Sequence, residues 1–128
     1  MSDKYSVFIV DDDNSARKGL ARLVRAGGYE VTTYASASGF LAKLSPEIAG
    51  CVILDSRMPD MSGDILAEKL ANYRDRLSII FVTADDDPAI LAKAKKLGAA
   101  GFFRKPVDGT ALIDAISWAF RSARDHSI

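Results

Sequence analysis

Hydrophobic and polar positions divide this chain into two kinds of segment. Short apolar runs, typical of strands buried on both faces of a parallel sheet, alternate with longer segments in which apolar residues recur every three or four positions, as in amphipathic helices. The runs that predict strands are residues 5–10, 30–34, 51–54, 79–82 and 101–104. This alternation with short connections predicts an α/β domain whose parallel sheet has helices on both faces.

Five helices are predicted, one after each strand. The first ends at Gly27-Gly28, the second ends before Pro46, and the third starts after Ser62-Gly63. The fourth starts near Pro88 and stops at Gly98, and the fifth runs from near Asp108 to about Arg124. The apolar positions that define the first four helices are Leu20, Leu23 and Val24, then Phe40, Leu41 and Leu44, then Ile65, Leu66 and Leu70, and then Ile90, Ala94 and Leu97. The strand at 30–34 is the most polar, so we expect it at an edge of the sheet.

The last predicted helix separates core residues from one exposed aromatic residue. Leu112, Ile116, Ala119, Phe120 and Ala123 share one helical face and are expected to pack on the sheet. Trp118 falls on the opposite side, and a tryptophan there is a candidate for docking a partner. The alternative is that Trp118 folds back against the fourth helix.

Composition indicates one domain spanning residues 1–128, with residues 122–128 as a frayed tail that contains His126. Seventeen basic residues balance seventeen acidic ones, which gives no electrostatic case for nucleic acid or an anionic membrane. No apolar segment approaches the length of a membrane-spanning helix, and the N-terminus lacks the apolar core of a signal peptide. The single cysteine, Cys51, lies in an apolar run and suits a reducing compartment, so we expect a cytoplasmic protein.

Carboxylates follow two of the predicted strands. Asp11 and Asp12 come directly after the first strand, and Asp55 comes directly after the third. An open α/β sheet binds its ligand beyond the carboxyl ends of its strands, so these side chains are expected to meet there. Their mutual repulsion requires a cation or protonation of some of them. Asp13 is expected to cap the first helix and not to bind the metal.

Two more polar groups follow the later strands, Thr83 and Lys105. Oxygen ligands suit Mg²⁺, and a carboxylate beside that ion can attack a phosphoryl group. The Lys105 ammonium and the Thr83 hydroxyl would then bind the phosphoryl oxygens, and the small Ala84 would leave room for the donor. The four groups together predict a site for a divalent metal and a phosphoryl group.

These motifs resemble the receiver domain of bacterial two-component response regulators over essentially the whole chain. The acidic pair corresponds to Asp11-Asp12, the phosphoacceptor to Asp55, the switch hydroxyl to Thr83, and the lysine before a cis proline to Lys105-Pro106. The resemblance implies a flavodoxin-like (βα)5 fold with strand order 2-1-3-4-5. It also implies that Mg²⁺ is required and that the Arg57 backbone carbonyl completes the metal site.

The resemblance implies a switch as well. Phe102 corresponds to the rotating aromatic residue of the family, whereas the adjacent Phe103 is expected on the opposite face of the sheet. Phosphorylation would remodel the face formed by the fourth helix, fifth strand and fifth helix. Arg57 and Asp85 occupy the two positions that tune the phosphoryl lifetime in the family, and they are either an ion pair across the site or two independent surface charges.

The implied partners are a histidine kinase or phosphotransfer protein as phosphodonor, and an output domain or separate partner on the remodelled face, or a phosphorylation-dependent homodimer. The chain is expected to be either a stand-alone receiver or part of a longer regulator. One alternative is a phosphatase that forms an aspartyl phosphate. That enzyme needs a second acid where Arg57 stands. The other is an interaction module without phosphorylation, which the intact set of site residues disfavours.

Overall fold

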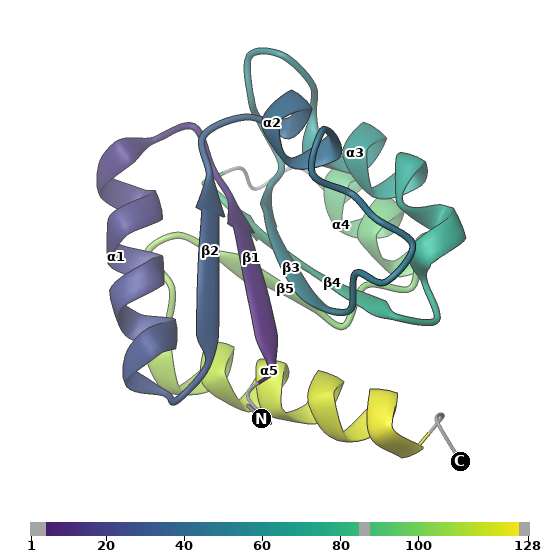
Figure 1. Cartoon of the computed structure of the whole chain (residues 1–128). Coiled ribbons are helices and arrows are strands. Elements are labelled where there is room, and N and C mark those ends of the chain that lie inside the picture. The colour runs from purple at the N-terminus through teal and green to yellow at the C-terminus, as the bar shows by residue number, and fades with distance from the viewer. Residues whose placement is uncertain (1–4, 85–87, 126–128) are drawn as a thin grey trace.

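The computed structural model describes residues 5–84 and 88–125, with side chains up to Ser122. Five parallel strands form one sheet in the order β2-β1-β3-β4-β5, which confirms the predicted flavodoxin-like topology (Figure 1). The strands are β1 (Ser6–Val10), β2 (Glu30–Tyr34), β3 (Gly50–Asp55), β4 (Leu77–Thr83) and β5 (Gly101–Arg104). The polar strand β2 lies at an edge, as predicted, and β1 and β3 lie inside the sheet.

Helices cover both faces of this sheet. The helices are α1 (Asn14–Ala26), α2 (Ala37–Leu41), α3 (Gly63–Lys69), α4 (Pro88–Lys96) and α5 (Gly109–Asp125), with a short 3₁₀ helix η1 (Ala71–Tyr73) before β4. Asp13 starts α1 as predicted, because its carboxylate accepts a hydrogen bond of 3.1 Å from the Ala16 N–H. Within the described residues, no helix combines the length and the apolar character that a membrane-spanning segment requires.

The core consists of two apolar layers, one on each face of the sheet. One layer joins the sheet to α2, α3 and α4 and contains Phe40, Leu66 and Phe81 among its fully buried side chains. The other joins the sheet to α1 and α5 and contains Leu112 and Ile116. Every residue of β3 is buried, so the strand that carries Asp55 is fixed on both faces.

The structure corrects several local predictions. Leu66 and Leu70 are buried, but Ile65 is 44% exposed, because Ala67 takes the inward position beside Leu66. Helix α2 ends at Leu41, so Leu44 lies after the helix. Helix α5 continues to Asp125 and includes part of the segment expected to form a frayed tail. Asp85 and His126 lie outside the described residues, as does the side chain of Ala123.

The prediction for the exposed side of α5 is confirmed for the residues that the structure describes. Leu112, Ile116 and Ala119 are buried, and Phe120 packs on Tyr5 with ring centroids 4.5 Å apart. Trp118 is 55% exposed and borders a groove between η1, β4 and the end of α4. The exposed tryptophan is therefore not part of the core face of its helix.

Candidate functional site

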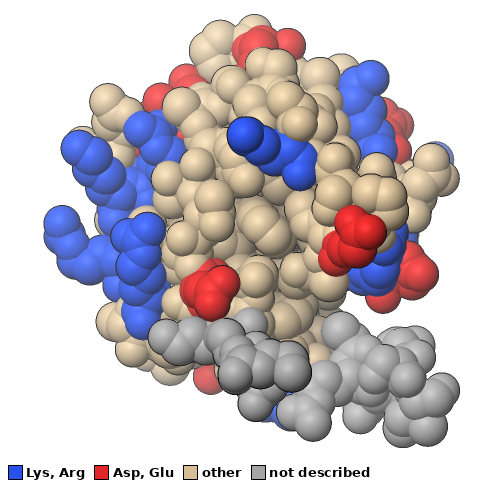
Figure 2. All heavy atoms as spheres, viewed as in Figure 1, with Lys and Arg blue, Asp and Glu red and all other residues tan. Residues whose placement is uncertain are grey.

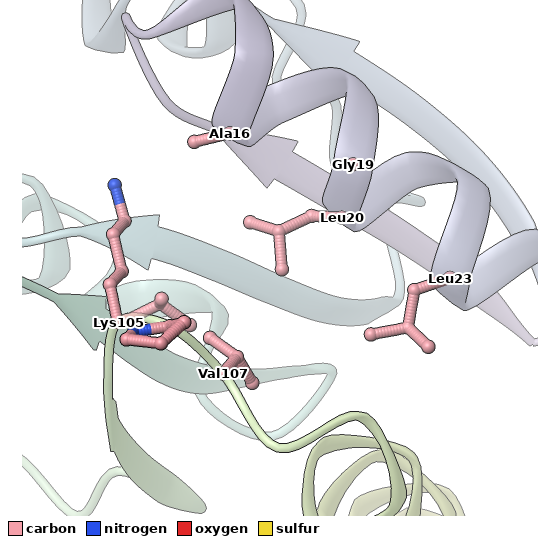
Figure 3. A pocket seen from close by; sticks show the side chains of 8 residues that line it. Ala16, Gly19, Leu20, Leu23, Lys105 and Val107 are labelled. Carbon is pink, nitrogen blue, oxygen red and sulfur yellow. The ribbon is translucent and has the colours of Figure 1, made fainter.

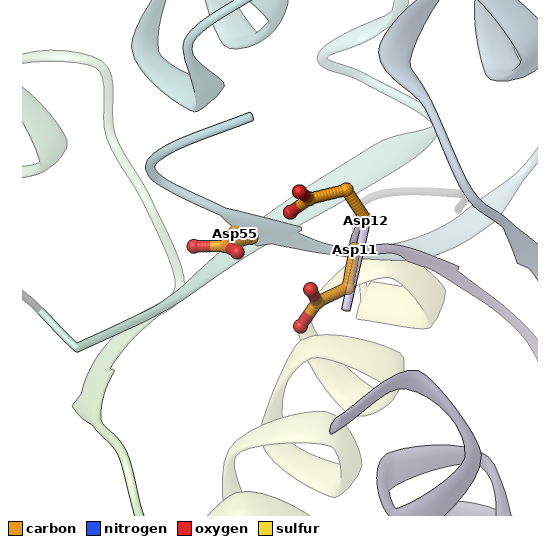
Figure 4. Close-up of side chains that lie close together, drawn as sticks. All are labelled: Asp11, Asp12 and Asp55. Carbon is orange, nitrogen blue, oxygen red and sulfur yellow. The ribbon is translucent and has the colours of Figure 1, made fainter. Parts of the chain in front are cut away.

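Three carboxylates gather at the carboxyl edge of the sheet. Asp11 directly follows β1, Asp55 ends β3, and one oxygen from each of Asp11, Asp12 and Asp55 lies within 4.8 Å of the other two (Figure 4). Asp11 and Asp55 are buried, at 1% and 8% exposure, whereas Asp12 is exposed. The pairing of β1 with β3 causes this meeting, because it aligns Val10 with Leu54 just before the two acids.

Backbone donors orient these carboxylates. The Asp13 N–H donates to Oδ1 of Asp11 at 3.0 Å, and the Arg57 N–H donates to Oδ1 of Asp55 at 3.2 Å. The Arg17 guanidinium donates to the Asp11 backbone carbonyl at 2.9 Å, which ties α1 to the same loop. Each buried acid therefore keeps its second oxygen, Oδ2, directed toward the site.

Lys105 bridges the two buried acids. Its Nζ lies 3.0 Å from Oδ2 of Asp11 and 3.5 Å from Oδ2 of Asp55. Lys105 directly follows β5, and its backbone N–H donates to the Thr83 carbonyl at 2.7 Å, which joins the ends of β4 and β5. The Lys105-Pro106 peptide bond is cis, as the resemblance implied.

The protonation of these groups follows from their surroundings. Burial raises the pKa of Asp55 and the nearby Asp11 carboxylate raises it further, while the Arg57 N–H and the Lys105 ammonium act in the opposite direction. Burial on its own would lower the pKa of Lys105, but the hydrogen bond that its ammonium donates to Asp11 and the charges of Asp11 and Asp55 outweigh this effect, so the pKa of Lys105 is raised. The site is therefore crowded with negative charge that one ammonium offsets incompletely.

The start of α3 fits tightly against the strand that carries Asp55. A Cβ on Gly63 would lie 2.4 Å from the Asp55 carbonyl oxygen and 2.9 Å from the Ser56 Cα, so only glycine allows this approach. The Gly63 N–H donates to the Ser56 carbonyl at 2.9 Å. This contact fixes the backbone on which Asp55, Ser56 and Arg57 stand.

Thr83 ends β4 and is 1% exposed. Its hydroxyl is hydrogen-bonded to the hydroxyl of Ser56, which is also buried. The sequence pattern indicated Thr83 as a site residue, but it did not indicate Ser56. The only sequence feature that pointed to Ser56 is its position directly after Asp55. That Ser56 contacts Thr83 follows from the pairing of Asp55 with Val82, and the sequence alone does not determine this register.

The remaining predicted residues lie around this centre. Phe102 is half-buried on the α2–α4 face and its ring centroid lies 6.4 Å from that of Phe81, whereas Phe103 packs on the opposite face, as predicted. The Arg57 side chain is exposed at the mouth of the site. The pairing of Arg57 with Asp85 stays a prediction, because Asp85 is outside the described residues.

Two hollows border the site. A cleft of about 510 Å³ lies between the β3–α3 loop and α4, and Asp12, Ser56 and Ile90 are among its lining residues. An apolar groove of about 470 Å³ lies on the other side, where Leu20 and Leu23 of α1 face Val107 and the stem of Lys105 (Figure 3). One end of this groove therefore reaches the lysine that contacts Asp11 and Asp55.

Charge is unevenly distributed although the chain has a formal net charge of zero. Lysine and arginine side chains gather over α1 at one side of the molecule (Figure 2), and Lys18, Arg22 and Arg25 there are exposed. A local basic strip on a neutral domain can orient an acidic partner without attracting polyanions in general.

The donor set fits a magnesium ion. Carboxylate oxygens are the ligands that Mg²⁺ prefers, and the ion binds through one or two carboxylates while keeping several waters. Asp11, Asp12 and Asp55 supply carboxylates close together, and the exposure of Asp12 leaves room for water. Sulfur and imidazole ligands, which favour other metals, are absent from this cluster of described residues.

The fold and the site define a class: a doubly wound α/β domain with an acidic centre and one lysine at the carboxyl edge of its sheet. A family model described as "Response regulator receiver domain" matches residues 7–117. The chain belongs to this family. Response regulators are signalling proteins of two-component systems that act with histidine kinases and output domains.

Individual relatives agree with this assignment. The chain is 42% identical over 124 residues to "Response regulator protein TmoT" of Ectopseudomonas mendocina, covering 96% of this chain and 56% of TmoT. It is similar to the solved response regulator StyR, with 44% identity, a TM-score of 0.82, and coverage of 97% of this chain and 66% of StyR. The chain thus spans about half the length of the curated relatives it matches.

A third similarity concerns a protein of about the same length as this chain. A CheY-like receiver domain protein from Methanospirillum hungatei is 28% identical, with a TM-score of 0.88 and coverage of 96% of this chain and 98% of that protein. The receiver fold therefore accounts for the whole described part of this chain.

Proposed function

We propose that this domain is a phosphorylation-operated switch in which Asp55 accepts the phosphoryl group. The observation that carries the proposal is the arrangement around Asp55, whose Oδ2 lies 3.5 Å from the Lys105 ammonium and within reach of the Asp11 and Asp12 carboxylates. A nucleophilic carboxylate, a cluster of metal ligands and a cation at one point are the requirements of phosphoryl transfer.

In this proposal Asp11, Asp12 and Asp55 hold Mg²⁺, together with the backbone carbonyl of Arg57. When bound, the ion neutralises charge on the phosphoryl oxygens and on the crowded carboxylates. The chain's own residues do the rest. The Asp13 and Arg57 N–H groups orient the two buried acids, and the close packing of Gly63 holds the backbone of Asp55 in place.

The transfer itself is a displacement at phosphorus. A carboxylate oxygen of Asp55 forms the new P–O bond while the P–N bond to a donor histidine breaks, and the imidazole leaves with the electron pair of that bond. Lys105 then exchanges part of its contact with Asp11 for a phosphoryl oxygen, and the Thr83 hydroxyl donates to another. The charge that develops on the phosphoryl group is thereby met by fixed donors.

Phosphorylation is coupled to a surface through β5. Thr83 moves toward the phosphoryl group, and the Phe102 side chain then turns inward. Phe102 packs against Phe81, which lies on β4 together with Thr83. This repacks the face formed by α4, β5 and α5. The phosphoryl group shifts the population only as far as it binds the repacked state more tightly than the resting one.

The partners follow from the two sides of the site. The phosphodonor, a histidine kinase or a phosphotransfer protein, approaches along the apolar groove of α1 that ends at Lys105, and the basic strip of α1 helps to orient it. The α4–β5–α5 face, with the exposed Trp118, docks an output domain, a separate partner or a second copy of this chain. Tuning of the phosphoryl lifetime by Arg57 and Asp85 is part of the same proposal.

Two other functions are less well supported. A phosphatase that forms an aspartyl phosphate needs a general acid near position 57, where this chain has an exposed arginine. An interaction module that has lost phosphorylation has no need for buried Asp11 and Asp55 carboxylates beside Lys105, an arrangement that is unfavourable without a ligand. Turnover of a phosphomonoester would support the first, and failure to bind Mg²⁺ would support the second.

Incubation with Mg²⁺ and a small phosphodonor, such as acetyl phosphate or phosphoramidate, tests the proposal. Intact-mass spectrometry is expected to detect one added phosphoryl group in the wild-type protein and none in Asp55→Asn. Chelation of Mg²⁺ should abolish labelling. Equal labelling of both proteins would show that Asp55 is not the acceptor.

A further inference from the structure

Ser56 contacts the hydroxyl group on which the proposed switch depends. The Ser56 and Thr83 hydroxyls form a buried hydrogen bond, with exposures of 4% and 1% for the two residues. The register explains this contact: Asp55 pairs with Val82 in the β3–β4 ladder, and Ser56 and Thr83 are the next residue on each side. Ser56 also lines the cleft between the β3–α3 loop and α4.

The backbone of Ser56 is held in place by the start of α3. The Ser56 carbonyl accepts the Gly63 N–H at 2.9 Å, and a Cβ on Gly63 would lie only 2.9 Å from the Ser56 Cα. Ser56 therefore stands on a fixed backbone at the start of α3. Its hydroxyl is an anchor, and Thr83 is the residue whose side chain must turn when the site is phosphorylated.

We propose that Ser56 is a positioning residue that holds Thr83 in the unphosphorylated arrangement and so opposes switching. This inference rests on the proposed function. Either hydroxyl can be the donor of this hydrogen bond, and in both cases the bond lasts only while the Thr83 side chain stays beside Ser56, so a turn of Thr83 toward a phosphoryl oxygen breaks it. The phosphoryl group must therefore compete with Ser56 for Thr83, and the strength of this hydrogen bond sets part of the resting equilibrium.

Removing the Ser56 hydroxyl should shift this equilibrium. In Ser56→Ala the resting arrangement loses one hydrogen bond that the active arrangement does not use, so the active arrangement becomes more populated. A ligand selective for the active arrangement should then bind more tightly. A merely structural serine would instead lower the stability of both arrangements equally and leave ligand affinity unchanged.

The test is a titration with beryllofluoride, which stands in for the phosphoryl group, in the presence of Mg²⁺. Affinity is measured for the wild-type protein, Ser56→Ala, Ser56→Thr and Ser62→Ala. Ser56→Thr keeps a hydroxyl at the same place. Ser62→Ala is the matched control, because Ser62 lines the same cleft and lies directly before Gly63.

We expect Ser56→Ala to bind beryllofluoride about 10-fold more tightly than wild type, within the usual range of conformational coupling. Ser56→Thr keeps the hydroxyl and should therefore bind beryllofluoride with an affinity close to that of the wild type. Ser62→Ala should also bind as the wild type does. Equal or weaker binding by Ser56→Ala, or the same gain in Ser62→Ala, would overturn the inference. Absence of binding in the wild type would contradict the phosphoacceptor proposal itself.

A double-mutant cycle measures the hydrogen bond without any phosphoryl analogue. The free energy of unfolding is compared for wild type, Ser56→Ala, Thr83→Val and the double variant in a chelator. The two substitutions should be non-additive, because each removes the same hydrogen bond. Strict additivity would show that the two hydroxyls do not act together in the resting protein and would overturn the inference.

Discussion

The Lys105 ammonium lies closer to the Asp11 carboxylate than to Asp55, at 3.0 Å against 3.5 Å. In the unphosphorylated protein this lysine thus lies nearer to the proposed metal ligand Asp11 than to the proposed phosphoacceptor Asp55. Its raised pKa reflects both carboxylates, although burial acts against it. In the proposed mechanism Lys105 and Mg²⁺ therefore compete for the same negative charge before phosphorylation and both bind the phosphoryl group afterwards.

Lys105→Ala should tighten Mg²⁺ binding while uncoupling the switch. In a hydrated site the repulsion between one ammonium and a divalent ion at about 4 Å is roughly 2 kcal/mol, so removing it should raise the affinity on the order of 30-fold. Titration by calorimetry measures this, with Lys95→Ala on the exposed side of α4 as control. Asp55 should remain phosphorylatable. If phosphorylated Lys105→Ala still shows the wild-type NMR shifts around Phe102, its assigned role is wrong.

Asp12 and Asp13 are adjacent acids with different expected roles. Asp12→Ala removes a proposed metal ligand and should weaken Mg²⁺ binding at least about 10-fold, the usual minimum for loss of metal-site partners. Asp13→Ala removes the cap of α1 and should lower the melting temperature while leaving Mg²⁺ affinity nearly unchanged. A larger loss of affinity from Asp13→Ala would reverse the two roles.

Asp55→Asn should stabilise the metal-free protein near neutral pH. Burial and Asp11 raise the pKa of Asp55, so this carboxyl holds its proton more tightly in the folded than in the unfolded protein, and the free energy of unfolding falls as the pH rises from the unfolded pKa through the folded one. The neutral amide avoids this loss. Thermal unfolding in chelator should give a higher melting temperature for Asp55→Asn at pH 7, and the two curves should converge below about pH 4, where the wild-type carboxyl is protonated in both states. A lower melting temperature for Asp55→Asn at pH 7 would contradict the pKa direction.

Trp118 should matter for docking and little for folding. It is 55% exposed, so Trp118→Ala should change the free energy of unfolding by about 1 kcal/mol or less. Phe120→Ala, two residues along and packed on Tyr5, is the contrasting variant and should cost about 3 kcal/mol. Analytical ultracentrifugation with beryllofluoride, alone and with an output partner, tests docking. If Trp118→Ala associates as strongly as the wild-type protein, Trp118 is not part of the docking surface.

Much of the fold follows from the sequence because continuous apolar runs identify buried parallel strands. The ends of those strands are harder to predict. Backbone pairing extends β3 from Gly50 to Asp55 and β4 from Leu77 to Thr83, beyond the apolar runs, since pairing depends on register and not on side-chain polarity. The exposure of Ile65 could not be foreseen from spacing alone, because a seven-residue helix presents few turns to define its inner face.

The candidate site was predictable to the extent that it consists of strand ends. Asp11, Asp55 and Lys105 meet because parallel strands place their carboxyl ends at one edge of the sheet. Ser56 was missed because its partner, Thr83, is 27 residues away and is assigned only by the register of two strands. That Lys105 lies closer to Asp11 than to Asp55 could not be predicted either, because the spacing of residues along the sequence does not determine distances between side chains.

The most direct test of the account is amide hydrogen exchange with and without beryllofluoride and Mg²⁺, in the wild-type protein and in Asp55→Asn. We expect altered exchange in β5 around Phe102 and in the adjoining parts of α4 and α5, in addition to the loops that contain Asp55 and Lys105. Asp55→Asn should show none of these changes. Changes confined to the loops around Asp55, with β5 and α4 as in the free protein, would contradict the claim that the state of Asp55 controls this face.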